Sequence, residues 1–475
     1  AVFGLDQVSD AIIGALAESP RTAGELATLL APRISEAEVQ QALVELAGVR
    51  AIRPVEDGRR QSKTVEDGNA EGEGTSFDHL RPPSTVSDRA KPSIKRIPLQ
   101  TLVLNVTSKC NLACKYCYEY GEDRIAEAAA NPQPRLMSEE VARQSVEFAF
   151  AEAGDNPNVH ITFFGGETLL NFPVLQRTVA MAREQARALG KTVDFSLTTN
   201  ATLLRPEIIE WLAREQVGVT ISIDGGREQQ DRFRVFHNGR GSYDVVLPKI
   251  RALLQQHRSR PIGARVTLTR QNLDVIPIYR HLIEEVGFWE VGFAPVTTSW
   301  QRDWAIEGSG YETMLEQFES LAAEFRDAAL AGRHHGFSNV RDTLQEIHKG
   351  MSKAYPCGAG FGLLGVATDG DVALCHRFAG SPSHEIGSVF EGVNRERQDA
   401  FLEQHHVDHK TECRTCWARP ICAGGCYHEA HTRYGSTAEP NLHYCTWIRR
   451  WTDTCLRIYG ELAERNPGWL ARLAA

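Results

Sequence analysis

The first part of the chain carries hydrophobic residues at helical spacing. The helices predicted from apolar side chains three and four residues apart are 8–16, 23–30 and 36–46. Thr22 and Ser35 precede two of these helices, and each is followed three residues later by a glutamate, as in a capping box. With a short strand expected at 49–52, residues 1–55 are predicted to form a small winged-helix-like domain.

From residue 101 the pattern changes to short β-branched or apolar runs that alternate with longer amphipathic stretches. The expected strands are 102–106, 160–164, 193–197, 217–223, 264–268 and 290–294. The clearest helices between them are 139–151, 172–189 and 206–215. Such alternation is typical of parallel β–α units, and six units are too few to close an eight-fold barrel. We therefore predict an α/β fold, a partial (β/α)6 barrel with its site at the C-terminal ends of the strands.

The segments outside the barrel have different compositions. One is a polar, charged linker with few large apolar residues, so it can bury little core. After residue 350, turns rich in Gly, Cys and Pro replace periodicity, which is typical of a small domain organised around metal. The predicted divisions are 1–55 for peptide docking, 56–100 as linker, 101–310 as the barrel, 311–350 as a helical bridge, 351–450 as the cysteine-rich domain and 451–475 as a C-terminal helix.

Charge and hydropathy exclude several classes of partner. A net charge of −9 makes nucleic acid a poor default partner. Residues 1–55 hold seven acidic and four basic side chains, which favours peptide docking over DNA binding in that domain. The sequence has no run of about 18 apolar residues, so no membrane span is expected. We expect no export signal at the start and predict a cytoplasmic location.

Eleven cysteines, all between Cys110 and Cys455, are the most unusual feature of the composition. In a large chain without an expected export signal, they favour metal or cluster ligation over a disulfide framework. Cys110, Cys114 and Cys117 directly follow the first predicted strand. Three thiolates on an iron–sulfur cube leave one iron open to chelate a cofactor, whereas structural zinc normally takes four ligands. Zinc and inert buried cysteines are the weaker alternatives.

The three-cysteine loop resembles that of the radical S-adenosylmethionine (SAM) superfamily. The resemblance implies that the open iron binds SAM and that one electron from the cluster splits it into a 5′-deoxyadenosyl radical, which abstracts hydrogen from carbon. Thr168 stands where the family usually has proline. The cofactor contacts expected from the resemblance are Tyr118, Gly165, Gly166, Glu167, Thr199, Asn200, Ser222, Asp224 and Arg265.

Particular roles are expected for four of these residues. Glu167 is expected to accept a hydrogen bond from the amino group of the cofactor, and Arg265 to pair with its carboxylate. Ser222 and Asp224 are expected to face ribose or substrate.

Seven further cysteines resemble the SPASM extension of peptide-modifying radical SAM enzymes, which holds two auxiliary iron–sulfur clusters. By that resemblance the ligands of the outer cluster are Cys413, Cys416, Cys422 and Cys445. Those of the inner cluster are Cys357, Cys375 and Cys426. Three clusters are therefore expected in all, and the inner one stays open to a non-cysteine group or a substrate thiolate. The alternative is a zinc site of Cys413, Cys416, Cys422 and Cys426. Cys455 is expected to be buried and inert.

Two further features concern the substrate. Four arginines between 227 and 240 follow the fourth predicted strand and suggest an acidic substrate segment, with Arg232 as the candidate contact. A solvated surface loop is the alternative. His376 directly follows Cys375, where the related sulfatase-maturing enzymes have an acid, so it is the candidate catalytic base or hydrogen-bond donor.

Within this class the sequence is most similar to the enzymes that mature quinohemoprotein amine dehydrogenase, on residues 355–360 and 422–427. The resemblance implies an oxidoreductase that links Cys sulfur to methylene carbons of Asp or Glu as thioethers within a small Cys-rich protein subunit. It also implies an external electron donor of the flavodoxin or ferredoxin type. Oxidation of Cys or Ser to formylglycine is the alternative activity, and a metal-stabilised peptide-binding chaperone is the alternative without catalysis.

Overall fold

The computed structural model describes residues 7–18, 21–48, 97–119, 123, 135–350 and 352–473. The chain divides into two compact units, Ala1–Ser93 and Ile94–Ala475, each with a hydrophobic core of its own. None of the described helices is both long and apolar enough to cross a membrane.

The first unit contains three helices in its described residues. They are α1 (Gln7–Glu18), α2 (Ala23–Leu30) and α3 (Glu36–Gly48). Ile12, Leu26 and Val39 contribute one buried side chain from each helix to the core. These helices confirm the ones predicted from hydrophobic spacing. The strand expected at 49–52 lies outside the described residues, so the winged-helix-like shape stays a prediction.

Both predicted capping boxes of this unit are present. The Glu25 N–H donates to Thr22 Oγ1 at 3.2 Å, and the Thr22 N–H donates to Glu25 Oε2 at 2.7 Å. Ser35 and Glu38 exchange the same pair of hydrogen bonds at 2.9 and 3.3 Å. Each box satisfies backbone donors that the first helical turn leaves unpaired.

The second unit is built on a curved sheet. Its first six strands are β1 (Thr101–Thr107), β2 (Asn158–Gly165), β3 (Thr192–Thr199), β4 (Gly218–Ser222), β5 (Ile262–Leu268) and β6 (Glu290–Pro295). Each pairs in parallel with the next, so all six carboxyl ends lie at one edge of the sheet. The predicted α/β fold and the six predicted strands are thereby confirmed.

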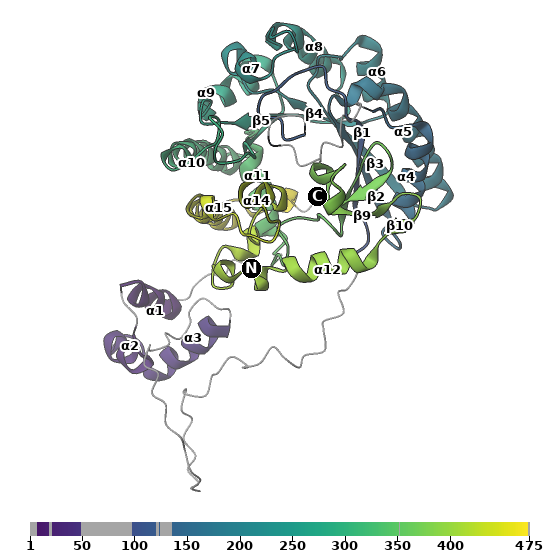
Figure 1. Ribbon diagram of the computed structural model, residues 1–475. Helices are drawn as coiled ribbons and strands as arrows, with labels where there is room; N and C mark the ends of the chain where they lie inside the picture. The colour runs from purple at the N-terminus through teal and green to yellow at the C-terminus, as the bar shows by residue number, and fades with distance from the viewer. Residues whose placement is uncertain are drawn as a thin grey trace. The chain divides into compact units, whose positions relative to one another are not determined.

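Helices cover the outer face of this sheet. They are α4 (Glu139–Glu152), α5 (Phe172–Ala188), α6 (Pro206–Arg214), α7 (Arg227–Phe233), α8 (Tyr243–Gln256), α9 (Val275–Arg280), α10 (Ser309–Leu330) and α11 (Ser338–His348). Figure 1 shows α4, α5, α6, α8, α7, α9 and α10, in that order, around the outside of the curve. The predicted helices within 139–215 and the helical bridge at 311–350 correspond to α4, α5, α6, α10 and α11.

The strands alternate between two kinds of side chain because successive residues point to opposite faces of a sheet. Phe163, Phe195 and Ile221 are buried on the face beneath the helices. Their neighbours Thr162 and Ser196 are only half-buried and polar. The inner face is therefore a hydrophilic lumen that can receive a polar ligand.

The cysteine-rich region extends the same sheet. Its strands are β7 (Leu363–Val366), β8 (Asp371–Ala373), β9 (Glu385–Ser388) and β10 (Gly392–Val393). β7 pairs in parallel with β1, and β8, β9 and β10 follow as antiparallel neighbours, which gives a ten-stranded sheet. This pairing places the second cysteine group beside the first strand of the barrel.

The remaining helices surround the cysteines. They are α12 (Arg395–His405), α13 (Arg419–Cys422), α14 (Tyr427–Tyr434), α15 (Cys445–Arg465) and α16 (Pro467–Leu470). α15 runs through the division predicted between 450 and 451. Most of the predicted linker 56–100 lies outside the described residues, and residues 97–100 lead directly into β1.

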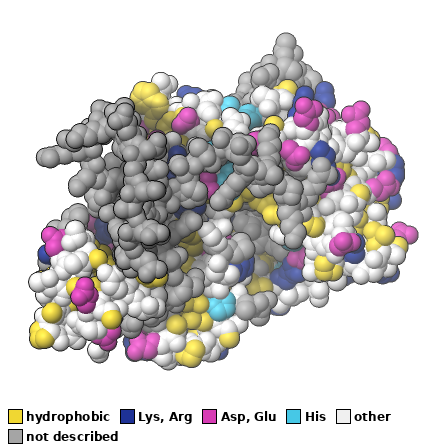
Figure 2. Space-filling model, turned by 90° about the horizontal axis from the view of Figure 1, so that it is seen from below, with side chains coloured by type: hydrophobic (Ala, Val, Ile, Leu, Met, Phe, Trp, Pro, Cys, Tyr) yellow, Lys and Arg dark blue, Asp and Glu magenta, His cyan; other side chains and the backbone are white. Residues whose placement is uncertain are grey.

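Acidic and basic side chains are interspersed over the described part of the surface seen in Figure 2. This face therefore carries no large field of one sign of the kind that binds nucleic acid.

Candidate functional site

The first cysteine loop follows β1 at the carboxyl edge of the sheet. Burial, with a smaller contribution from Cys117, raises the pKa of the Cys110 and Cys114 thiols to about 12, so the three side chains are electrostatic neighbours. None of them is in a disulfide. Thiols with such pKa values stay protonated at neutral pH until a metal binds, and iron binding supplies that driving force. The donor set fits a cluster held by three thiolates.

Gly165 and Gly166 hold this loop against the end of β2. A Cβ on Gly165 would lie 2.3 Å from the Thr107 carbonyl oxygen, and one on Gly166 would lie 2.1 Å from that of Lys109. The backbone of Gly165 also has a φ of 124°, which favours glycine. In the described structure the glycines thus bring backbone against the cysteine loop. The direct contact with a cofactor expected for them stays a prediction.

Glu167 connects the ends of β2 and β3. Its buried carboxylate accepts hydrogen bonds from Thr199 Oγ1 at 2.6 Å, from the Asn200 N–H at 2.8 Å and from the Leu169 N–H at 3.1 Å. Burial raises the pKa of Glu167. Because its contacts come from the chain itself, Glu167 positions the loop after β3, and acceptance from the cofactor amino group stays a prediction.

Asn200 contacts the first cysteine loop directly. Its Nδ2 lies 3.9 Å from Cys110 Sγ and donates to Asn111 Oδ1 at 3.0 Å. The structure therefore brings the predicted residues of the β2 and β3 ends together with the first cysteine group.

Asp224 is bonded to protein groups in the described structure, and its expected contact with ribose or substrate stays a prediction. It is fully buried, and its Oδ1 accepts from the Thr267 N–H at 3.0 Å. Its Oδ2 pairs with Arg234 Nε at 3.0 Å and accepts from the Tyr116 hydroxyl. Both carboxylate oxygens are thus bonded to other groups of the protein. Because Tyr116 lies within the cysteine loop, its hydrogen bond to Asp224 holds that loop in position.

The predicted positive loop is also largely neutralised. Arg232 donates to Glu228 Oε1 and to the Gln271 carbonyl, both at 2.7 Å. Arg227 pairs with Asp244, and Arg234 pairs with Asp224. The expected acidic-substrate contact by Arg232 is therefore not supported. The carboxylates that pair with Arg234 and Arg227 belong to Asp224 and Asp244, which lie just before and just after the arginine-rich stretch in sequence.

Arg265 and Ser222 lie opposite each other in the β4–β5 pairing, facing the lumen. Arg265 stays exposed although Ala264 and Val266 on either side are buried. Partial removal from water and the neighbouring Arg377 lower the pKa of Arg265. In the described part of the chain no carboxylate forms an ion pair with Arg265, which leaves it available to a ligand carboxylate.

The second cysteine group separates into two sets of electrostatic neighbours. One set is Cys357, Cys375 and Cys426. The other is Cys413, Cys416, Cys422 and Cys445. Cys426 thus lies with the inner set, which opposes the zinc site formed by Cys413, Cys416, Cys422 and Cys426. Among the described residues no three His, Cys, Asp or Glu side chains converge on a single-ion site. Cys455 is buried on α15, as predicted.

His376 lies between the inner set and the barrel. Its ring centroid is 4.6 Å from that of Phe164 on β2, and its carbonyl oxygen accepts from Asn105 Nδ2 at 3.1 Å. Burial, and then Arg377, lower the pKa of His376 to about 3, so the imidazole is neutral at pH 7. Its Nδ1 is buried without a hydrogen-bond partner. The catalytic role of His376 stays a prediction.

Tyr118, one of the expected cofactor contacts, is packed between the two cysteine groups. Arg377 Cζ lies 4.4 Å from its ring centroid, and the His428 ring centroid lies 5.3 Å away. The hydroxyl of Tyr118 is buried without a hydrogen-bond partner. These contacts make packing its evident role in the described structure.

Sequence reasoning missed several neighbours of the cysteines. His237 Nε2 lies 3.0 Å from the Cys110 carbonyl oxygen, because residues 235–237 pair with the cysteine loop. His428 is 1% exposed, and neither ring nitrogen has a partner. Arg377 and His428 each had one available signal, a position two residues after Cys375 and Cys426 respectively. The contact of His237 depends on segments that are distant in sequence.

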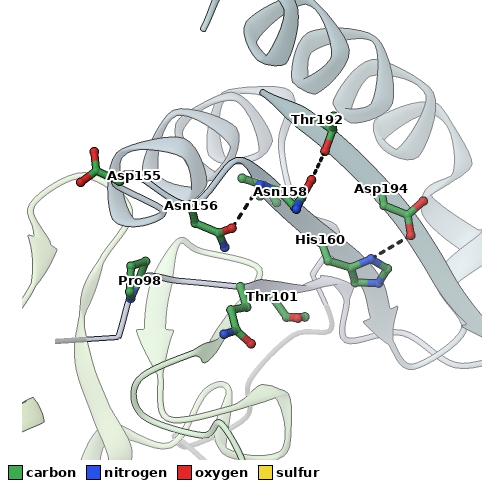
Figure 3. Close-up of a pocket in the computed structure, with 10 residues that line it drawn as sticks. Pro98, Thr101, Asp155, Asn156, Asn158, His160, Thr192 and Asp194 are labelled. Atoms are coloured by element: carbon green, nitrogen blue, oxygen red, sulfur yellow. Dashed lines mark hydrogen bonds and ion pairs between the residues drawn. The ribbon is translucent and has the colours of Figure 1, made fainter. Parts of the chain in front are cut away.

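A large cavity lies elsewhere, at the amino-terminal ends of β1 to β3. It measures about 800 Å³ and is lined by His160 and Asp194 among others (Figure 3). Asp194 Oδ2 lies 3.2 Å from His160 Nδ1, and His160 Nε2 lies 2.8 Å from Ser196 Oγ. This order of groups is that of a hydrolase triad.

Two features oppose hydrolysis in this cavity. Arg260 Nη1 also donates to Asp194 at 3.1 Å, which neutralises the carboxylate. The backbone of β2 and β3 is engaged in the sheet, so it offers no oxyanion site. The side-chain hydrogen bonds hold the strands together, and the candidate site remains at the opposite edge.

Comparison with known proteins identifies relatives of this arrangement. The radical SAM superfamily model matches residues 104–274, the segment from β1 to the start of α9. A serine-type anaerobic sulfatase-maturating enzyme from Bacteroides thetaiotaomicron is 28% identical over 373 residues, or 73% of this chain and 86% of the relative. A cysteine-type anaerobic sulfatase-maturating enzyme from Clostridium novyi is 24% identical over 360 residues, or 72% and 92% of the two chains.

Solved structures share the fold. Native anSMEcpe with bound AdoMet has a TM-score of 0.65 at 21% identity, over 77% of this chain and all of that one. Streptococcus suis SuiB bound to the precursor peptide SuiA has a TM-score of 0.52 at 13% identity, over 92% of each chain.

Proposed function

We propose that this chain, a radical SAM enzyme with a SPASM-like C-terminal region, oxidises a side chain of a peptide by removing a hydrogen atom from carbon. One observation carries the proposal: all cysteines except Cys455 fall into three sets of neighbouring thiols, beside a polar lumen. Three thiol sets at the mouth of a barrel fit three iron–sulfur clusters better than they fit a chaperone.

The first set holds the cluster that binds SAM in this proposal. When bound, the cofactor and that cluster supply a 5′-deoxyadenosyl radical, which abstracts the hydrogen atom. Gly165 and Gly166 keep the loop at the strand ends, and Asn200 orients Cys110. Arg265 would pair with the cofactor carboxylate, because it is accessible in the lumen and lacks an ion pair among the described residues.

The other two sets hold the auxiliary clusters in this proposal. The outer set contributes four thiols and the inner set three. The inner set is the one that neighbours the barrel, through His376 and Arg377, so its cluster is placed to take the electron that the substrate radical loses. An external carrier of the flavodoxin or ferredoxin type would exchange electrons with the enzyme.

Formylglycine is the first candidate product. Two curated relatives named as sulfatase-maturating enzymes, one serine-type and one cysteine-type, align over more than 70% of this chain. Solved structures of anSMEcpe with bound AdoMet and peptide share its fold. In this reaction the enzyme would convert Cys or Ser of a peptide into an aldehyde.

A thioether between Cys sulfur and an Asp or Glu methylene carbon is the second candidate. The inner set has three thiols, and within the described part of the chain no fourth cysteine neighbours it. A substrate thiolate at that position would lie beside the barrel mouth. The neutral His376 in place of an acid also favours a product other than formylglycine.

We assign peptide docking to the first unit. Leu29 and Val44 expose 51% and 52% of their surface there, so two large apolar side chains are accessible to a peptide on this unit. The fold shared with SuiB, solved with its precursor peptide, supports a peptide substrate.

The two products are separated by one experiment. Anaerobically reconstituted enzyme is incubated with SAM, dithionite and a peptide containing Cys, Ser, Asp and Glu, and the peptide is analysed by mass spectrometry. An aldehyde that reacts with a hydrazide indicates formylglycine. Loss of two hydrogens together with loss of an alkylatable thiol, without aldehyde, indicates a thioether. If SAM is cleaved and colour and iron are present but no peptide of a substrate library changes, the assignment to peptide oxidation is wrong.

A further inference from the structure

Each of two cysteine sets has one buried or half-buried arginine beside it. Arg234 is a neighbour of Cys114 in the first set, and Arg377 is a neighbour of Cys375 and Cys426 in the inner set. The two arginines differ in whether their charge is compensated.

The charge of Arg234 is compensated. Its Nε lies 3.0 Å from Asp224 Oδ2, and the side chains are only 10% and 1% exposed. The Arg234 guanidinium also lies 5.4 Å from the Tyr116 ring. The pair contributes almost no net charge at the first cysteine set.

The charge of Arg377 is not compensated by a carboxylate. Its Nη1 donates to Thr297 Oγ1 at 3.0 Å, and its Cζ lies 4.4 Å from the centre of the Tyr118 ring. Over the described ranges no Asp or Glu forms an ion pair with Arg377. Glu429 is among its electrostatic neighbours, but that carboxylate lies 3.4 Å from Arg433 Nε and 3.0 Å from His443 Nε2, so it is shared with other partners. A cation withdrawn from water without a paired anion is costly, so this arrangement favours further negative charge close to Arg377.

The thiols of the inner set are the source of that negative charge. Arg377 stands two residues after Cys375, and its guanidinium lies over Tyr118, the side chain packed between the two cysteine groups. When those thiols ligate a cluster they are thiolates, and the cluster becomes more negative still when it is reduced. A cation at this place stabilises the reduced form more than the oxidised form.

We propose that Arg377 raises the reduction potential of the inner auxiliary cluster, while the Arg234–Asp224 pair leaves the potential of the SAM-binding cluster low. This inference rests on the proposed function, because it requires that both sets hold clusters. The potential of an iron–sulfur cluster is set by nearby charge, hydrogen bonds and burial. This difference in local charge keeps the SAM-binding cluster at the low potential that reductive SAM cleavage needs. It also makes the inner auxiliary cluster the better electron acceptor.

Redox titration followed by electron paramagnetic resonance tests the assignment. The full chain is reconstituted anaerobically as wild type, Arg377→Gln, which removes the charge, and Arg377→Lys, which keeps it. The inner cluster is identified by the signal lost in Cys426→Ala, and the first cluster by the signal that changes when SAM is added. Arg457→Gln serves as a control because Arg457 is 78% exposed on α15.

The expected result is specific to one cluster and one variant. In Arg377→Gln the midpoint potential of the inner cluster moves to a more negative value, and in Arg377→Lys and Arg457→Gln it does not. The first cluster keeps its midpoint in all variants. An unchanged midpoint in Arg377→Gln, an equal shift of every cluster, or loss of the inner cluster's iron in that variant would overturn the inference. A wild-type chain without cluster signals would instead overturn the proposed function.

Discussion

The side-chain amide of Asn200 lies 3.9 Å from the sulfur of Cys110, so the end of β3 contacts the first cysteine loop directly. The same residue donates to Asn111 Oδ1 and accepts from the Thr202 N–H, so it joins the cysteine loop to the loop after β3. Glu167 fixes the backbone of Asn200 from the end of β2. The geometry of the three-thiol loop therefore depends on residues some ninety positions away in sequence.

Replacing Asn200 with alanine should slow SAM cleavage. The change removes the N–H···S contact and the hydrogen bonds that Asn200 makes with Asn111 and Thr202, at a cost of ~1.4 kcal/mol, or about tenfold in rate. The measurement is formation of 5′-deoxyadenosine by reconstituted protein with dithionite. Asn158→Ala at the opposite end of β2 is the control and should retain the wild-type rate. Equal rates in Asn200→Ala and wild type would show that the amide does not orient the loop.

Gly166→Ala should disrupt the first cysteine loop. The new Cβ would lie 2.1 Å from the Lys109 carbonyl oxygen, and backbone on both sides would have to move. We expect a loss of ~1–3 kcal/mol in the free energy of unfolding and less iron bound. Gly460→Ala on α15 is the matched control, since its Cβ meets no atom within 4 Å. A variant at 166 as stable as that at 460 would contradict the packing described for this turn.

Asp224→Asn should destabilise the protein through Arg234. The substitution leaves a buried guanidinium unpaired, and breaking such a pair costs ~3 kcal/mol. Chemical denaturation of the variant measures the loss. Asp453→Asn breaks the exposed pair with Arg457 and should change stability by less than ~0.5 kcal/mol. Similar small effects at both positions would refute the buried pair's supporting role.

Stability should fall as pH decreases below neutrality, in part because of His384. Burial, and then His431 and His405, lower the pKa of His384 to about 4. The unfolded chain, with an ordinary histidine pKa near ~6.5, binds a proton first, so the contribution is complete above that pH and is lost towards pH 4. His384→Gln should therefore show a smaller difference in unfolding midpoint between pH 7.5 and 5 than wild type. An identical difference in both proteins would exclude this contribution.

The barrel was predictable from sequence because each strand is a short apolar run and each following helix has a clear amphipathic period. Because parallel strands end at one edge, the same pattern also predicted that residues such as Gly166 and Asn200 would meet the cysteine loop. Residues 363–393 were harder. Their strands have two to four residues, too few for a period of two to be recognised, so their pairing with β1 was not foreseen.

The ion-pair partners of charged residues were the second feature that could not be predicted from the sequence. Arg232 and Arg234 lie two positions apart in sequence, yet one pairs with Glu228 and the other with buried Asp224. Counting the charges along the sequence alone assigned both arginines to a positively charged loop. Only the three-dimensional contacts show that Asp224 pairs with Arg234 and accepts a hydrogen bond from Tyr116.

The central claim is that the loop of Cys110, Cys114 and Cys117 holds an incomplete cluster that binds SAM. The most direct measurement is the electron paramagnetic resonance spectrum of reduced, anaerobically reconstituted protein before and after SAM is added, in wild type and Cys114→Ala. The account predicts that one component changes on addition of SAM in wild type, and that this component is absent from Cys114→Ala while the auxiliary signals remain. A wild-type spectrum that SAM leaves unchanged, or a SAM-responsive signal that survives in Cys114→Ala, would contradict it.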